Sequence, residues 1–89
     1  MSEQAGVSGK AYAVVGGTSG LGLSAARALV RHGARVAVCG RSEARLAEAL
    51  EMLGENAVGK KLDAAAKGAV DQFLDFACGE IGDLEGLYH

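Results

Sequence analysis

The chain has 89 residues, of which 49% are hydrophobic and 22% charged, and its formal net charge at pH 7 is −2. A chain of this length makes one small domain, and its composition is that of a globular protein rather than a disordered one. The slightly acidic balance gives no electrostatic reason to expect nucleic acid or an anionic membrane surface as a partner.

The first half of the chain predicts a strand, a helix and a second strand. Residues 11–15 form a short apolar run bounded by glycine, as a buried parallel strand would. Residues 20–32 have leucine and alanine at helical spacing, and Gly33 supplies the C-terminal stop. Residues 35–39 form the second apolar strand.

The second half of the chain continues this alternation. Ser42 is a good N-cap for a second helix, whose leucines recur at helical spacing. Residues 57–62 form a weaker third strand with two lysines inside it, residues 66–80 a third helix, and residues 84–88 a fourth apolar run. Strands that alternate with helices predict a parallel sheet covered on both faces, because each right-handed crossover passes over a face. We therefore expect residues 1–89 to form a single α/β domain.

The lack of a recognisable targeting signal and the pattern of cysteine usage favour a cytoplasmic protein. The first ten residues lack the apolar core of a signal peptide, and no apolar run approaches the length that spans a bilayer. Cys39 and Cys78 are isolated in the sequence, so we expect two reduced packing residues rather than a disulfide. No cluster of histidine, cysteine and carboxylate residues has metal-ligand spacing, and we expect no metal site.

Four glycines lie within residues 16–22, GGTSGLG, where the first strand meets the first helix. Glycine allows positive φ angles and close approach to the backbone, and the helix beyond presents unpaired N–H groups and the positive end of its dipole. Together these features predict a cradle for a phosphate or pyrophosphate. The alternative is a purely structural turn, since tight turns and close helix packing also use glycine. A Walker-type site is disfavoured because no Gly-Lys-Ser/Thr ends the loop.

This loop resembles the cofactor loop of the short-chain dehydrogenase/reductase family, which usually reads Thr-Gly-x-x-x-Gly-x-Gly, with Val15 at the place of the threonine. The resemblance continues in VAVCGRS, in LDA around Asp63, and in GDLEGLYH, which is similar to the lead into the family's Asn-Asn-Ala-Gly strand. It covers nearly the whole chain but only the first part of a typical member. It implies a Rossmann-like three-layer α/β/α fold with strand order 3-2-1-4 and a dinucleotide cofactor.

The end of the second strand bears on the choice of cofactor. Folds that prefer NAD usually place an acidic residue there, on the ribose hydroxyls, whereas an arginine accommodates the 2′-phosphate of NADP. This chain has Gly40 followed by Arg41 and Ser42, so the resemblance implies NADP, with NAD the less favoured choice. Arg41 offers a planar fork of donors and Ser42 a hydroxyl. The alternative is that Arg41 is a solvated charge at the start of an exposed helix.

Other polar residues have two open interpretations. Asp63 follows the third strand, where family members often have an acidic residue beside the adenine amino group, and its other interpretation is a helix N-cap. Thr18 and Ser19 are candidates both for capping the first helix and for touching phosphate. The residues that the resemblance assigns to the cofactor are Gly16, Thr18, Ser19, Gly20, Leu21, Gly22, Arg41, Ser42 and Asp63.

The catalytic part of the family's pattern does not occur in these 89 residues. Family members use a Tyr-x-x-x-Lys pair on a later helix, but Tyr12 is followed four residues on by Gly16, and Tyr88 has only one residue after it. We therefore predict no catalytic residue and an NADP-binding portion of an oxidoreductase that is inactive alone. The alternatives are a small binding or assembly module that keeps the fold without the cofactor, and a truncated product of a longer reading frame.

The last strand bears on self-association. In strand order 3-2-1-4 the fourth strand lies at an edge of the sheet. It has unpaired backbone groups there and carries the apolar residues Leu84 and Leu87. Pairing of this edge between two copies is a way to close it. We therefore expect a homo-oligomer formed through the C-terminal strand.

Overall fold

The computed structural model describes residues 8–18 and 20–88, which form a four-stranded sheet with helices between the strands. In chain order the elements are β1 (Ala11–Val14), α2 (Gly20–Arg31), β2 (Arg35–Gly40), α3 (Glu43–Leu53), the 3-10 helix η1 (Gly54–Asn56), β3 (Ala57–Lys61), α4 (Ala69–Ile81) and β4 (Leu84–Tyr88). The alternation of strands and helices predicted from the sequence is confirmed. Within the described residues, no helix has both the length and the apolar character needed to cross a membrane.

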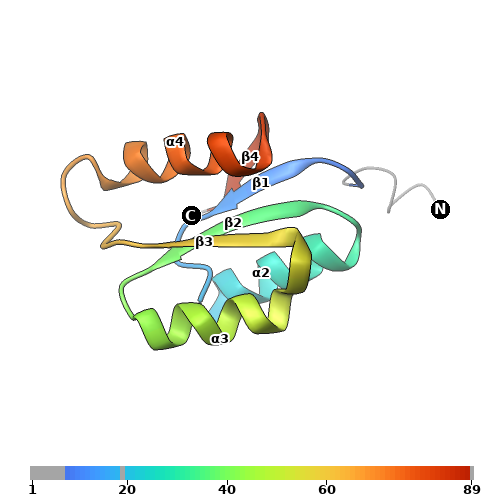
Figure 1. The fold of residues 1–89 in the computed structure, drawn as a ribbon, viewed down its shortest axis with the longest axis horizontal. Coiled ribbons are helices and arrows are strands. Elements are labelled where there is room, and N and C mark those ends of the chain that lie inside the picture. Colours follow the sequence, from blue (N-terminus) through green and yellow to red (C-terminus); the bar gives the residue numbers. More distant parts are fainter. Residues whose placement is uncertain (1–7, 19, 89) are drawn as a thin grey trace.

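The sheet is parallel throughout, and its strands lie in the order β3-β2-β1-β4. Helices α2 and α3 cover one face and α4 covers the other, so the sheet is the middle of three layers (Figure 1). The chain runs outward from β1 to β3 and then crosses over through α4 to the other side of β1. The predicted α/β/α layers and the strand order 3-2-1-4 are confirmed.

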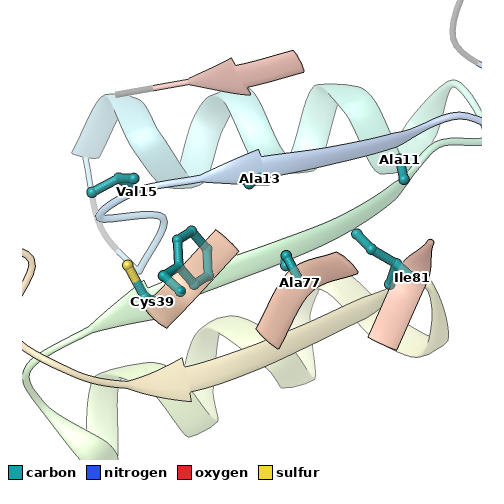
Figure 2. Packing of buried hydrophobic residues seen from close by; sticks show 8 residues of the cluster. Ala11, Ala13, Val15, Cys39, Ala77 and Ile81 are labelled. Atoms are coloured by element: carbon teal, nitrogen blue, oxygen red, sulfur yellow. The ribbon is translucent and has the colours of Figure 1, made fainter. Parts of the chain in front are cut away.

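Each face of the sheet has its own hydrophobic cluster, because alternate residues of a strand point to opposite faces. On the face covered by α4, the small side chains of Ala13 and Ala37 pack with Phe73, which is fully buried. Figure 2 shows that Val15 and Cys39 close this cluster at the carboxyl ends of the strands. The cluster on the other face consists of Val14, Ala26, Leu29, Ala34, Val36, Val38, Leu46 and Leu53.

Helix α4 begins later than the sequence predicts, at Ala69 rather than near residue 66. Asp63 is the reason: its Oδ1 accepts a hydrogen bond from the N–H of Ala65 at 2.9 Å, and its carbonyl oxygen accepts one from the N–H of Ala66 at 2.9 Å. These bonds close a tight turn before the helix. The residue that precedes α4 is Gly68, in the left-handed region with φ 78°. The interpretation of Asp63 as a helix N-cap is therefore wrong.

The two edges of the sheet differ in character. β3, at one edge, carries Lys60 and Lys61, and lysine on an edge strand opposes pairing with another sheet. β4, at the other edge, has β1 as its neighbour among the described strands, and the side chains of Leu87 and Tyr88 are each 46% exposed. The β4 edge is therefore the more apolar of the two.

Candidate functional site

An open cleft of about 770 Å³ lies at the carboxyl ends of β1, β2 and β3. It is lined by the loop after β1, the turn between β2 and α3, and the turn after β3, which leave the sheet at the same end (Figure 1). Ligand sites typically measure about 300–1,000 Å³, and in open parallel sheets they lie beyond the carboxyl ends of the strands. The lining residues are Gly16, Thr18, Cys39, Gly40, Arg41, Ser42, Arg45, Leu62, Asp63, Ala64 and Ala65.

Two glycines of the loop 16–22 hold backbone conformations that other residues rarely adopt. The φ angle is +74° at Gly16 and +59° at Gly20, both in the left-handed region. A Cβ atom added at either position would meet nothing within 4 Å, so the space beside the main chain is open. The loop is thus both sharply bent and uncovered, which are the two properties of a backbone that binds an anion.

The other two glycines of this loop allow close packing. A Cβ added at Gly17 would lie 2.6 Å from Cγ1 of Val38, and one added at Gly22 would lie 2.5 Å from the carbonyl oxygen of Gly16. The first turn of α2 therefore rests directly on the loop. Its first N–H groups have no partner within the helix, and they carry the positive end of the helix dipole. Ser19, another predicted contact, lies outside the described residues.

Gly40 joins the walls of the cleft. A Cβ added there would lie 2.9 Å from Oγ1 of Thr18, so the absence of a side chain lets the loop after β1 approach the end of β2. The carbonyl oxygen of Gly40 also accepts a hydrogen bond from the N–H of Leu62 at 2.9 Å, which ties the turn after β3 to the same residue. Thr18, Arg41 and Asp63 are brought to one cleft by these two contacts.

The rim of the cleft at the start of α3 is basic. Ser42 caps this helix, because its Oγ accepts a hydrogen bond from the N–H of Arg45 at 3.2 Å, and its hydroxyl proton is left to donate elsewhere. Arg41, Ser42 and Arg45 are all exposed. The charged lining residues are two arginines and one aspartate, Asp63, which gives the lining a formal charge of +1.

The structure does not bring all of the predicted cofactor residues to one cleft. Those that line the main cleft are Gly16, Thr18, Arg41, Ser42 and Asp63. Leu21 and Gly22 instead line a smaller hollow of about 200 Å³ beside Tyr88, and the side chain of Leu21 is 90% exposed. Gly20 lines neither hollow. The contacts of all these residues with a ligand stay a prediction.

Cys39 is a lining residue that the sequence suggested only as a packing residue. Its side chain belongs to the cluster beneath α4 and is 1% exposed. Burial raises the pKa of the Cys39 thiol above its ordinary value of 9.0, and a backbone hydrogen bond with Gly16 acts in the opposite direction. The thiol is therefore protonated at neutral pH and forms an apolar part of the cleft next to the glycine loop.

Arg45 is a second lining residue that the sequence analysis missed. A signal for it was present, since the third residue after a serine cap is often Glu or Gln, which completes a capping box. Here that position holds an arginine, although the helix dipole favours negative charge in the first turn. Arg45 therefore does not stabilise the helix through its dipole, and its guanidinium adds positive charge to the lining of the cleft.

Comparison with known proteins identifies relatives that match most of the chain. The sequence matches the short chain dehydrogenase family over residues 10–89. It is 39% identical over 74 residues to a protein named uncharacterized oxidoreductase DltE from Bacillus subtilis (strain 168), over 83% of this chain and 29% of that protein. It is 36% identical over 78 residues to short chain dehydrogenase/reductase dpmpG from Macrophomina phaseolina (strain MS6), over 83% of this chain and 45% of that one. The chain thus spans less than half the length of these relatives.

Solved structures share the fold of this chain. L-sorbose reductase from Gluconobacter frateurii, complexed with NADPH and L-sorbose, has a TM-score of 0.83 and 28% identity, over 91% of this chain and 32% of that chain. Glucose dehydrogenase of Caenorhabditis elegans in its apo form has a TM-score of 0.82 and 27% identity, over 90% of this chain and 36% of that chain. This chain therefore has the architecture of one part of each of those larger proteins.

Proposed function

The chain belongs to the short-chain dehydrogenase family, and we propose that it binds NADP in the cleft at the carboxyl ends of β1, β2 and β3. The observation that carries this proposal is the meeting of an uncovered glycine loop and two arginines in one cleft. The loop suits the pyrophosphate of a dinucleotide, because its main-chain N–H groups and the start of α2 favour negative charge. The arginines suit a further phosphate beyond it.

The residues of the loop fit such a ligand sterically. Added Cβ atoms at Gly16 and Gly20 would occupy space that is open in the structure, so a phosphate meets the backbone there without an intervening side chain. Thr18 and Ser42 add hydroxyl groups on two sides of the cleft. We infer that the pyrophosphate lies along residues 16–22 and that the adenosine lies toward Arg41, Ser42 and Asp63.

The preference for NADP over NAD rests on the end of β2. Gly40 stands where a dinucleotide fold that prefers NAD has a carboxylate for the ribose hydroxyls, and Arg41 follows it. Arg45 places a second guanidinium on the same cleft. The likeness to a reductase whose solved structure contains NADPH supports the same choice. Asp63 opposes the preference for NADP, because its negative carboxylate also lies on this side of the cleft.

We further propose that the 89 residues by themselves bind the cofactor without turning over a substrate. When bound, a nicotinamide cofactor supplies hydride transfer. The residues of this chain bind and orient it, but they include no Tyr-x-x-x-Lys pair to exchange a proton with a substrate. A family member that contains this chain as its first part would place its substrate site in the segments that follow.

Isothermal titration calorimetry with NADP, NAD and AMP tests the proposed function. We expect micromolar or tighter NADP binding and weaker NAD binding. Arg41→Gln should weaken NADP binding by about tenfold to a hundredfold, the size of a lost charge-assisted hydrogen bond, and should leave NAD binding nearly unchanged. Arg27→Gln is the matched control, because Arg27 is an exposed residue of α2 that lines no cleft.

The same titration separates the alternatives. Equal affinity for NAD and NADP would overturn the preference and keep the dinucleotide site. Binding of neither nucleotide by a folded chain would overturn the proposed function and favour a small assembly module.

We also propose that copies of this chain associate through β4. The support is that β4 is an edge strand and that its apolar residues Leu87 and Tyr88 are half-exposed. Light scattering over a range of concentrations should show a concentration-dependent dimer that Leu87→Lys weakens. A clean monomer at high concentration would contradict this proposal.

A further inference from the structure

Arg41 and Asp63 form an ion pair across the mouth of the cleft. Nη1 of Arg41 lies 3.9 Å from Oδ2 of Asp63, and the two side chains are 77% and 47% exposed. The pair connects the end of β2 with the turn after β3. The arginine on which the NADP preference rests therefore has an anionic partner within the chain itself.

The two side chains of this pair differ in how firmly they are held in place. Asp63 is held in place, because its Oδ1 accepts the hydrogen bond from the N–H of Ala65 and its neighbour Leu62 is bonded to Gly40. Arg41 is a long and more exposed side chain, and within the described residues the ion pair is the polar contact that its guanidinium makes. When an anion enters the cleft, the arginine can turn toward it, whereas the carboxylate stays at the mouth.

We propose that Asp63 competes with the 2′-phosphate of NADP for Arg41, and thereby limits how strongly the cleft prefers NADP over NAD. This inference rests on the proposed function and adds a residue that sets its selectivity. Asp63 acts in two ways: it pairs with the guanidinium before binding, and its negative charge repels the phosphate after binding. NAD has a hydroxyl in place of the 2′-phosphate, so neither effect applies to it at this position.

The pair is exposed, so its effect is modest. Exposed ion pairs contribute little to stability, and salt screens both the pairing and the repulsion. We therefore expect the selectivity to change by less than the loss of Arg41 itself would change it. Raising the ionic strength should reduce the effect of Asp63 further.

Asp63→Asn tests the proposal, because asparagine keeps an oxygen that can accept the hydrogen bond from Ala65 and removes the charge. Calorimetric titration at low salt should show the ratio of NADP to NAD affinity rising by about threefold to tenfold, because any lost contact between Asp63 and the adenosine weakens both dinucleotides alike. Adenosine 2′,5′-bisphosphate and AMP, which differ only in the 2′-phosphate, should show the same contrast. Glu55→Gln is the matched control, because it removes one negative charge from η1 at the far end of α3.

The double variant Arg41→Gln/Asp63→Asn shows whether Asp63 acts through Arg41. The gain in the ratio of NADP to NAD affinity from Asp63→Asn should shrink by at least half when Arg41 is absent. An undiminished gain, or an unchanged NADP to NAD affinity ratio in Asp63→Asn, would overturn this inference while the proposed function stands. If the unmodified chain binds neither dinucleotide, both are overturned.

Discussion

The glycine loop of residues 16–22 and the polar rim, formed by Arg41, Ser42, Arg45 and Asp63, border one cleft in different ways. The loop contributes backbone that is packed against β2 and α2 at Gly17 and Gly22, where an added Cβ would collide with neighbours. The rim contributes exposed side chains. A substitution at Gly17 or Gly22 should therefore disturb the fold and the ligand together, whereas replacement of Arg41 or Arg45 in the rim should change ligand choice with little effect on the fold. Under the proposed function, the backbone of the loop would contact the features that all dinucleotides share, and the side chains of the rim would contact those that distinguish them.

A methyl group placed in the loop should give the largest effect. In Gly22→Ala the new Cβ would lie 2.5 Å from the carbonyl oxygen of Gly16, so the loop or α2 must shift. We expect the free energy of unfolding to fall by about 1–3 kcal/mol, the usual cost of overpacking. We expect dinucleotide affinity to fall with it. Urea unfolding followed by circular dichroism measures the first effect and calorimetry the second.

Gly79→Ala is the matched control for this substitution. Gly79 lies within α4, and an added Cβ there would meet nothing within 4 Å. Alanine is the better helix former, so we expect the free energy of unfolding to rise by about 0.5–1 kcal/mol. If the two substitutions had the same effect, close packing at Gly22 would not explain its loss of stability.

Ser42→Ala sharpens the comparison, because Ser42 is the rim residue that also caps α3. Loss of the bond to the Arg45 N–H should lower the free energy of unfolding by about 1 kcal/mol. Ser24→Ala, at an exposed position within α2, should change it by less than about 0.5 kcal/mol. Chemical unfolding of the two variants side by side measures the difference. Equal stabilities would mean that the cap contributes nothing.

Cys39 should give the smallest effect, through pH. Because burial raises the pKa of this thiol above 9.0, the folded chain holds the proton more tightly than the unfolded chain does. The resulting stability is full below pH 9.0 and is lost as pH rises through the folded pKa. Cys39→Ala should therefore lose less stability than the unmodified chain between neutral pH and about pH 10. Parallel losses in both chains, measured by urea unfolding, would contradict this assignment.

The fold could be predicted because local signals agreed along the chain. Apolar runs, the glycines that end helices and the serine cap at residue 42 each pointed to the same alternation, and the structure has it. The start of α4 was misplaced because Asp63 offers its own side chain to the backbone, and this local turn competes with helix formation. The helical spacing of apolar residues does not reveal that competition.

Residues of the site could be predicted one by one from the sequence, but the contacts between its separate elements could not. The loop 16–22 is one continuous segment, so its glycines could be recognised together. The pairing of Arg41 with Asp63 requires the ends of β2 and β3 to be neighbours, and the place of Cys39 beside the loop requires β1 and β2 to pair. These contacts arise from tertiary structure, which spacing alone does not reveal.

The alanines beneath α4 connect the far face of the sheet to the opening of the cleft. Ala13 and Ala37 have the smallest side chains that can pack there, and Phe73 is fully buried in the same cluster, so the helix lies close to the sheet. The turn that carries Asp63 leads directly into this helix. A bulkier residue at position 37 would push the helix outward and draw the turn with it. We therefore expect such an exchange to change the opening of the cleft, although Ala37 does not line it.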